Sequence, residues 1–309
     1  MIDVSEWLVV RDEPLGASEK CWLRDPSDSD PTRGLWLFKP VVVHDNGHSQ
    51  RGDHSERIAE GVAGLVGVPT AETRLALRHK RYGTLSRNVR PGVEWDMYTG
   101  GLWLINAVDL PFAGRDSREK SPSTPGYTLD AIQLVLQDTG CPPSSSPELQ
   151  PFSGWDVFIG MLILDGLISN RDRHEQNWSI LRPSLGDDTT RLAPAYDNES
   201  SLGFNLTDDR RARILQTPSM LDAYRRRATA WRFDWGSQQI PSLIDLASMA
   251  ATRTTSSVRK HWGEKLSAIK DGDFETIVSG VYGMSDVAHR FSVNLMQENL
   301  KEMRNAIRD

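Results

Sequence analysis

Cysteine is scarce in this chain of 309 residues, which contains only Cys21 and Cys141. Two cysteines are too few for a disulfide framework, and these two lack the spacing of zinc ligands. Long apolar runs are also missing, so no segment is predicted to span a membrane. Basic residues are not in excess, because 36 Lys and Arg stand against 42 Asp and Glu and give a net charge of −6. This balance argues against a nucleic-acid-binding protein with a basic surface overall and leaves room only for a local basic patch.

A basic leader segment is absent as well, since the first residues include acids at Asp3 and Glu6. We therefore expect no signal peptide, and we predict a cytoplasmic protein without a membrane partner. The sequence does contain 38% hydrophobic residues and ten tryptophans. That content indicates a packed globular protein rather than a disordered chain.

The order of the expected elements predicts an α+β fold with two lobes. The first part is rich in strands with one helix, and the part after residue 154 is mostly helical with a short β interruption. We place a β-rich N-lobe at residues 1–88 and a helical C-lobe at residues 89–309. The expected strands of the N-lobe are Trp7–Val10, Cys21–Leu23, Gly34–Pro40, Thr70–Leu77 and Tyr82–Val89.

The helix expected in the N-lobe covers Ser55–Val66. Its apolar residues recur at intervals of three and four, which is the period of a helix with one buried face. Asp53 or Ser55 is expected to cap its start, and Gly67 follows its end. The polar stretch from His44 to His54 has no periodicity and predicts a mobile loop.

The most informative segment lies between residues 155 and 200. A nearly all-apolar stretch, Trp155–Ile168, predicts a helix that is buried on most sides. The polar loop Asn170–Asn177 follows, and then two short strands, Trp178–Leu181 and Leu192–Tyr196, that can pair as a hairpin. Such a hairpin would bring Asn177 and Asp197 together at one end, close to Asp172.

This set of side chains suits phosphoryl transfer. That reaction needs a carboxylate that orients and deprotonates a hydroxyl, together with oxygen ligands for Mg²⁺. Asp172 and Asn177 are five residues apart, as are the catalytic Asp and the metal-binding Asn of the protein-kinase loop. Asp197 would be the second metal ligand. This spacing of Asp and Asn often arises by chance. It gains weight here because it follows a buried helix and precedes the hairpin that ends in Asp197. His174 could be a metal ligand, but we favour a role in bracing the loop near the nucleotide.

The N-lobe offers the cationic group that the nucleotide phosphates need. Lys39 lies in an apolar strand, and Glu56 on the first turn of the next helix could pair with it, as a Lys–Glu pair does in kinases. Glu60 is a rival partner, and a simple edge lysine is the alternative. Gly16 and Ser18 lie between two strands in a turn that could cradle phosphate, although one glycine turn is a weak signal.

These stretches together resemble the HipA-like serine/threonine kinases. The resemblance runs in order from about residue 14 to about residue 205. It is carried by four segments: Leu35–Pro40 (LWLFKP), Asp53–Ala63 (DHSERIAEGVA), Leu167–Asn177 (LISNRDRHEQN) and Leu192–Gly203 (LAPAYDNESSLG).

The resemblance implies a two-lobed protein-kinase-like fold that uses ATP and Mg²⁺. It implies that Asp172 is the catalytic base, that Asn177 and Asp197 hold the metal, and that Lys39, positioned by Glu56, contacts the phosphates. It further implies an adenine-binding hinge at Leu85, Ser86, Arg87 and Asn88, and a regulatory autophosphorylated serine in a loop before the helix, where Ser49 and Ser55 compete.

The sequence also departs from its relatives. It lacks the extra N-terminal subdomain of the larger toxin members, so it resembles a shorter, stand-alone branch, and an antitoxin-like partner is not supported. It also lacks the His-Arg-Asp, Asp-Phe-Gly and Ala-Pro-Glu motifs of ordinary protein kinases. Three functions stay open: a protein serine/threonine kinase, which we favour, a phosphotransferase for a small molecule or a modified peptide, and a nucleotide-binding regulator without turnover.

Two basic clusters follow the candidate site, at residues 210–213 and 225–227, with Trp231 and Trp235 beyond them. They could bind an acidic substrate, RNA or phosphates. A solvated helix face is the commoner use of such runs, and we favour it here.

Overall fold

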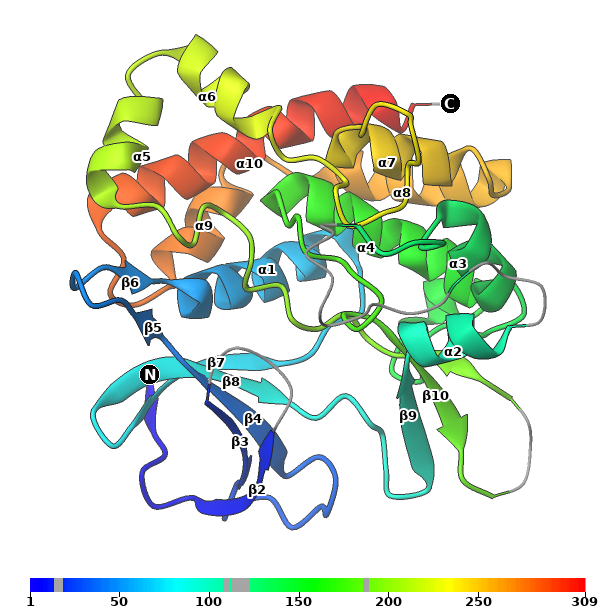
Figure 1. Ribbon diagram of the computed structural model, residues 1–309, viewed down its shortest axis with the longest axis horizontal. Coiled ribbons are helices and arrows are strands. Elements are labelled where there is room, and N and C mark those ends of the chain that lie inside the picture. The colour runs from blue at the N-terminus through cyan, green and yellow to red at the C-terminus, as the bar shows by residue number, and fades with distance from the viewer. Residues whose placement is uncertain (14–18, 108–111, 113–122, 186–188, 309) are drawn as a thin grey trace.

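The fold consists of a β-rich part and a larger helical part (Figure 1). The computed structural model describes residues 1–13, 19–107, 112, 123–185 and 189–308. Every helix in this described portion is too short or too polar to cross a membrane. The β-rich part contains the N-terminus, and the C-terminus lies on the far side of the helical part (Figure 1).

One mixed sheet forms most of the N-terminal part, and its strands follow the order β1-β7-β8-β4-β3-β2. Neighbouring strands are antiparallel except for β1 and β7, which are parallel. Each strand lies where the sequence predicts one, apart from β1. Their bounds are β1 (Ile2–Asp3), β2 (Leu8–Glu13), β3 (Lys20–Arg24), β4 (Leu35–Pro40), β7 (Thr73–Arg78) and β8 (Arg81–Arg87).

The sheet register puts Lys39 on one face and the apolar core of the sheet on the other. Lys39 pairs with Thr84 across β4 and β8, whereas Phe38 pairs with Leu85. Because side chains alternate along a strand, Lys39 and Thr84 share the face opposite to Phe38 and Leu85. The core on the second face is formed by buried apolar side chains: Val4, Leu23, Trp36, Phe38, Ala76 and Leu85.

Regular structure replaces the loop that was expected between residues 44 and 54. β5 (Val42–Val43) and β6 (Ser49–Gln50) pair as a hairpin, and α1 begins at Gly52. The expected capping of α1 by Asp53 or Ser55 is wrong, because both lie inside the helix and no side chain caps its first turn. Instead, Asp53 accepts hydrogen bonds from Arg51, and Ser55 Oγ donates to the carbonyl of Ser201. The end of the helix at Gly67, in the left-handed conformation, is as expected.

The remaining helices form the C-terminal part, together with the short 3-10 turn Pro147–Leu149. Helix α1 covers Gly52–Val66. The helices of the C-terminal part are α2 (Gly100–Asn106), α3 (Leu129–Leu136), α4 (Gly154–Ile168), α5 (Asp208–Ile214), α6 (Pro218–Arg225), α7 (Leu243–Ala251), α8 (Ser256–Ala268), α9 (Asp273–Ser279) and α10 (Asp286–Ala306).

Helix α1 lies between the sheet and the helical part (Figure 1). Its buried apolar residues, among them Ile58, Val62 and Val66, belong to the same core as those of α4 and α10. The N-terminal sheet encloses a separate, smaller core. α1 is therefore anchored to the helical part, although it precedes most of that part in the sequence.

A second, three-stranded sheet supports the candidate loop. Its order is β11-β10-β9, with β9 (Trp95–Thr99), β10 (Ser179–Pro183) and β11 (Arg191–Leu192). The antiparallel pairing of β10 with β11 confirms the predicted hairpin, with Ile180 opposite Leu192.

Candidate active site

Helix α4 is the foundation of the site. Its side chains are buried almost without exception, so it is fixed on all sides by the core. Ser153 and Asp156 form a capping box at its start. The helix ends at Ser169, which adopts the left-handed conformation and turns the chain into the polar loop. A loop that leaves so constrained a helix begins from a defined position.

Arg173 holds this loop together from inside. Its buried guanidinium forms a two-point ion pair with Asp165 of α4, at 2.8 and 2.9 Å. It also donates to the carbonyls of Asn177 and Tyr196, at 2.8 and 3.2 Å, and to Asn198 Oδ1 at 2.7 Å. One side chain therefore connects α4, the polar loop and the segment after β11. Arg173 therefore connects the backbone at Asn177 to the backbone at Tyr196, the residue before Asp197.

Asp172 and Asn177 are joined across the loop. The Asn177 side-chain amide donates to the Asp172 carbonyl at 2.7 Å, which leaves the Asn177 Oδ1 atom as an available oxygen ligand. The Asp172 backbone N–H donates to Asn170 Oδ1 at 3.1 Å. The Asp172 carboxylate is directed away from these bonds and contacts Arg232 and Ser200.

Asp197 links the segment after β11 to the N-terminal sheet. Its Oδ1 accepts a 2.7 Å hydrogen bond from Lys39 Nζ, and Lys20 Nζ of β3 lies 3.9 Å from its Oδ2. Burial favours the protonated carboxyl, but the positive charges of Lys39 and Lys20 outweigh it and hold the pKa of Asp197 at about 2. The negative charges of Asp197 and Glu199 in turn raise the pKa of Lys39 despite its burial. Both groups are therefore charged at neutral pH.

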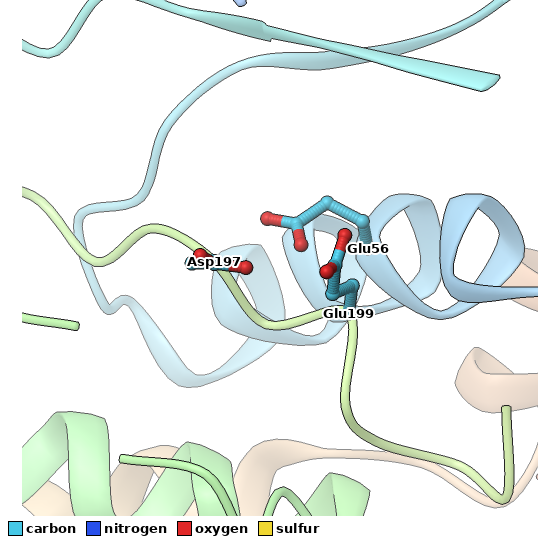
Figure 2. A group of neighbouring side chains, drawn as sticks. All are labelled: Glu56, Asp197 and Glu199. Carbon is cyan, nitrogen blue, oxygen red and sulfur yellow. The ribbon is translucent and has the colours of Figure 1, made fainter. Parts of the chain in front are cut away.

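Three carboxylates converge beside Lys39. Figure 2 shows Glu56 on α1 facing the segment that carries Asp197 and Glu199. One oxygen from each of the three lies within 4.8 Å of the others. Burial raises the pKa of Glu56 to about 7, against the opposing charge of Lys39. Both Glu56 oxygens are buried, and the charge of Lys39 and the backbone N–H of Asn198 offset the burial of the carboxylate only in part.

These residues fit a hard divalent cation. Mg²⁺ prefers carboxylate and amide oxygens, and the group offers Asp197, Glu199 and Glu56, with Asn177 on the neighbouring loop. The incompletely compensated carboxylate of Glu56 is the observation that favours a cation here, because burying a carboxylate without full pairing is costly.

The ion pair expected between Lys39 and Glu56 is not made in this structure. Lys39 Nζ lies 2.7 Å from Asp197 and 3.7 Å from Glu199, and Glu56 is outside ion-pair distance. The two nearer carboxylates compete successfully for the ammonium group. Glu60, the predicted rival, is engaged elsewhere, since it accepts from the backbone N–H and the hydroxyl of Thr73.

The predicted hinge is the end of β8, a strand that pairs with β7 on one side and with β4 on the other. Leu85 is fully buried in the sheet core, so only its backbone could meet a nucleotide. Ser86 pairs with Leu37 in the register that puts it on the face of Lys39. The Arg87 guanidinium stacks on Trp36, and the Asn88 N–H donates to the carbonyl of Leu35. Gly16 and Ser18, the predicted phosphate cradle, lie outside the described residues.

His174 contacts its own loop. Its Nδ1 accepts from the backbone N–H of Gln176 at 3.2 Å, as expected of a bracing residue. Burial lowers the pKa of His174, so the ring is neutral at pH 7.

Sequence reasoning missed four residues of the site: Lys20, Arg173, Glu199 and Arg232. A signal existed for two of them, because Arg173 adjoins Asp172 and Glu199 follows Asp197 by two positions. Lys20 adjoins the predicted phosphate cradle, but its distance from Asp197 depends on the sheet register. Arg232 lies 60 residues beyond Asp172, and nothing in the sequence connects the two.

No protein-family model matches the sequence, and no curated protein is detectably similar to it. Solved structures do match. The proinflammatory kinase CtkA of Helicobacter pylori has a TM-score of 0.73 at 17% identity, over 99% of this chain and 97% of that one. The fold is therefore a two-lobed kinase-like fold, as the sequence resemblance implied.

Two further matches have lower scores. HipA of Shewanella oneidensis, solved with HipB and operator DNA, gives a TM-score of 0.43 at 12% identity, over 97% of this chain and 68% of that one. The Golgi casein kinase gives 0.36 at 10% identity, over 97% and 73%. The fold assignment rests on CtkA, which is covered over nearly its whole length.

Proposed function

We propose that this protein is an ATP- and Mg²⁺-dependent kinase that phosphorylates a serine or threonine hydroxyl of a protein. The observation that carries the proposal is the ion pair between Lys39 and Asp197. It joins a cation of the sheet to the segment after β11, which Arg173 connects to the loop that presents Asp172. Phosphoryl transfer needs the cation at the nucleotide phosphates and the carboxylate at the acceptor hydroxyl.

Each residue has a task in this reaction. Lys39, with Lys20 beside it, binds the nucleotide phosphates. Asp197 holds the metal together with Asn177, and Glu199 and Glu56 add carboxylate oxygens. The bound Mg²⁺ supplies positive charge that offsets the charge of the phosphate oxygens.

Asp172 acts on the acceptor. It orients the hydroxyl and takes its proton while the hydroxyl oxygen bonds to the γ-phosphorus. The bond from that phosphorus to the bridging oxygen of the β-phosphate breaks, and ADP leaves. Arg173 holds Asn177 and the segment of Asp197 at a fixed separation, which pre-organises the site.

The experiment is incubation of the wild-type chain with labelled ATP and Mg²⁺, followed by measurement of ADP release and by mass spectrometry of phosphate on the chain. Asp172→Asn should lower turnover by about 10²–10⁴-fold, the usual contribution of a general base, while ATP still binds. A variant that keeps more than half of the wild-type rate would overturn the assignment of Asp172. ATP binding by the wild type without any ADP release would overturn the kinase proposal itself.

A further inference from the structure

The carboxylate of Asp172 is already occupied by a cation. Arg232 Nε donates to Asp172 Oδ1 at 2.6 Å, and its Nη2 contacts the same oxygen. Ser200 Oγ lies 3.4 Å from the other oxygen, Oδ2. An acceptor hydroxyl has to approach one of these oxygens. Arg232 therefore lies where the acceptor must bind.

A second arginine and an indole complete this surface. The guanidinium carbon of Arg232 lies 4.0 Å from the ring centroid of Trp231, and that of Arg171 lies 5.9 Å from it. Arg171 is exposed and forms no ion pair with any residue that the structure describes. The carbonyl of Arg232 accepts from the N–H of Thr124, so the backbone of the arginine is fixed.

Arg171 adds a second guanidinium to the one that is paired with Asp172. Both guanidinium groups lie near the Trp231 ring, and of the two only that of Arg232 is paired with a carboxylate of the described residues. An anion bound here would pair with Arg171, because a guanidinium binds carboxylate or phosphate through two parallel hydrogen bonds.

We propose that the hydroxyl acceptor carries a carboxylate or a phosphate close to the hydroxyl, and that Arg171 and Arg232 beside Trp231 bind this group. The inference rests on the proposed kinase function and names its substrate class. The acceptor's anion takes over the guanidinium of Arg232 from Asp172 Oδ1. That oxygen is then free to receive the proton of the acceptor hydroxyl, and acceptors without an anion leave Asp172 paired to Arg232.

Binding of peptides tests the proposal without requiring turnover. Four serine peptides are compared by calorimetry, with Mg²⁺ and a non-hydrolysable ATP analogue present. The serine is flanked by glutamate, by phosphoserine, by glutamine or by lysine. We expect the glutamate or the phosphoserine peptide to bind at least about tenfold more tightly than the glutamine peptide, which is the usual range for hydrogen bonds to charged groups. Which of the two binds more tightly identifies the anion.

Charge-changing variants separate recognition from a structural role. Arg232→Gln should remove most of the preference for the anionic peptide, and Arg171→Glu should move the preference toward the lysine peptide. A residue that only supports the loop would weaken all four peptides together. Arg33→Gln is the matched control, because Arg33 is an exposed arginine in the turn between β3 and β4. This variant should keep the wild-type preference.

Equal affinity of the wild type for the anionic and glutamine peptides would overturn the proposal, and so would an unchanged preference in Arg171→Glu. The proposed function fails separately, when the wild type releases no ADP and transfers no phosphate. An active kinase without charge preference refutes only the substrate class.

Discussion

Replacement of Arg173 by methionine is the sharpest test of how the site is built. The side chains of Arg173 and Asp165 are 2% and 1% exposed, so their ion pair lies in the interior. Arg173→Met leaves the Asp165 carboxylate buried without its cation, and it removes the donors to Asn177, Tyr196 and Asn198. Breaking a buried ion pair from one side costs about 3–5 kcal/mol. We expect the free energy of unfolding to fall by that amount.

A double variant separates stability from function. Asp165→Leu combined with Arg173→Met removes both charges, and replacement of a buried pair by apolar groups is often close to neutral. In urea unfolding, the double variant should therefore regain most of the stability that Arg173→Met loses. Its ATP turnover should stay low, because the guanidinium that bonds to both Asn177 and Tyr196 is still missing. A single Arg173→Met variant within about 1 kcal/mol of the wild type would refute the assigned role. Recovery of turnover in the double variant would refute it as well.

Three further predictions concern the metal, the pH response and the hairpin before α1. Asp197→Ala should weaken Mg²⁺-ATP binding by about 10–100-fold, and Asn177→Ala should weaken it less, because only the first variant loses a charged ligand. Calorimetry measures this affinity, and an unchanged value for Asp197→Ala would contradict the prediction. Because burial raises the pKa of Glu56 from 4.5 to about 7, the folded protein holds a proton that the unfolded chain releases. The free energy of unfolding should fall as pH rises between these values, by up to about 3 kcal/mol, and Glu56→Gln should remove that slope in urea titrations at several pH values. Ser49 lies on β6 near the α1 terminus, and Ser49→Asp should reduce ATP turnover while Ser49→Ala does not; equal rates in both variants and the wild type would exclude a regulatory phosphate there.

The sequence predicted those elements whose signal is local. The ten apolar side chains of α4 indicate a buried helix by themselves, and the β10–β11 hairpin follows from two short apolar runs around a turn. Asp172, Asn177 and Asp197 could be proposed together because the loop and the hairpin are adjacent in sequence. Arg173 connects the backbone of the loop at Asn177 to Tyr196, which precedes Asp197.

Features that depend on distant contacts could not be predicted in this way. The start of α1 was misplaced because Arg51 and Ser55 bond to Phe204 and Ser201, which replace a local cap. The partner of Lys39 was uncertain because it depends on how the sheet faces Asp197. Arg232 was invisible, since its position next to Asp172 results from packing of a loop against residues near Thr124.

The shared core of α1 and α4 has a consequence for folding. Ile58, Val62 and Val66 emerge from the ribosome about a hundred residues before the helix that covers them. Backbone hydrogen bonds between Ala195 and residues 69 and 71 add a second junction, both at 2.8 Å and two residues from Asp197. The β-rich part therefore cannot reach its final state on its own, because its helix would expose an apolar face to water. Although the molecule has two lobes, the shared core leads us to expect that they unfold together in a single transition.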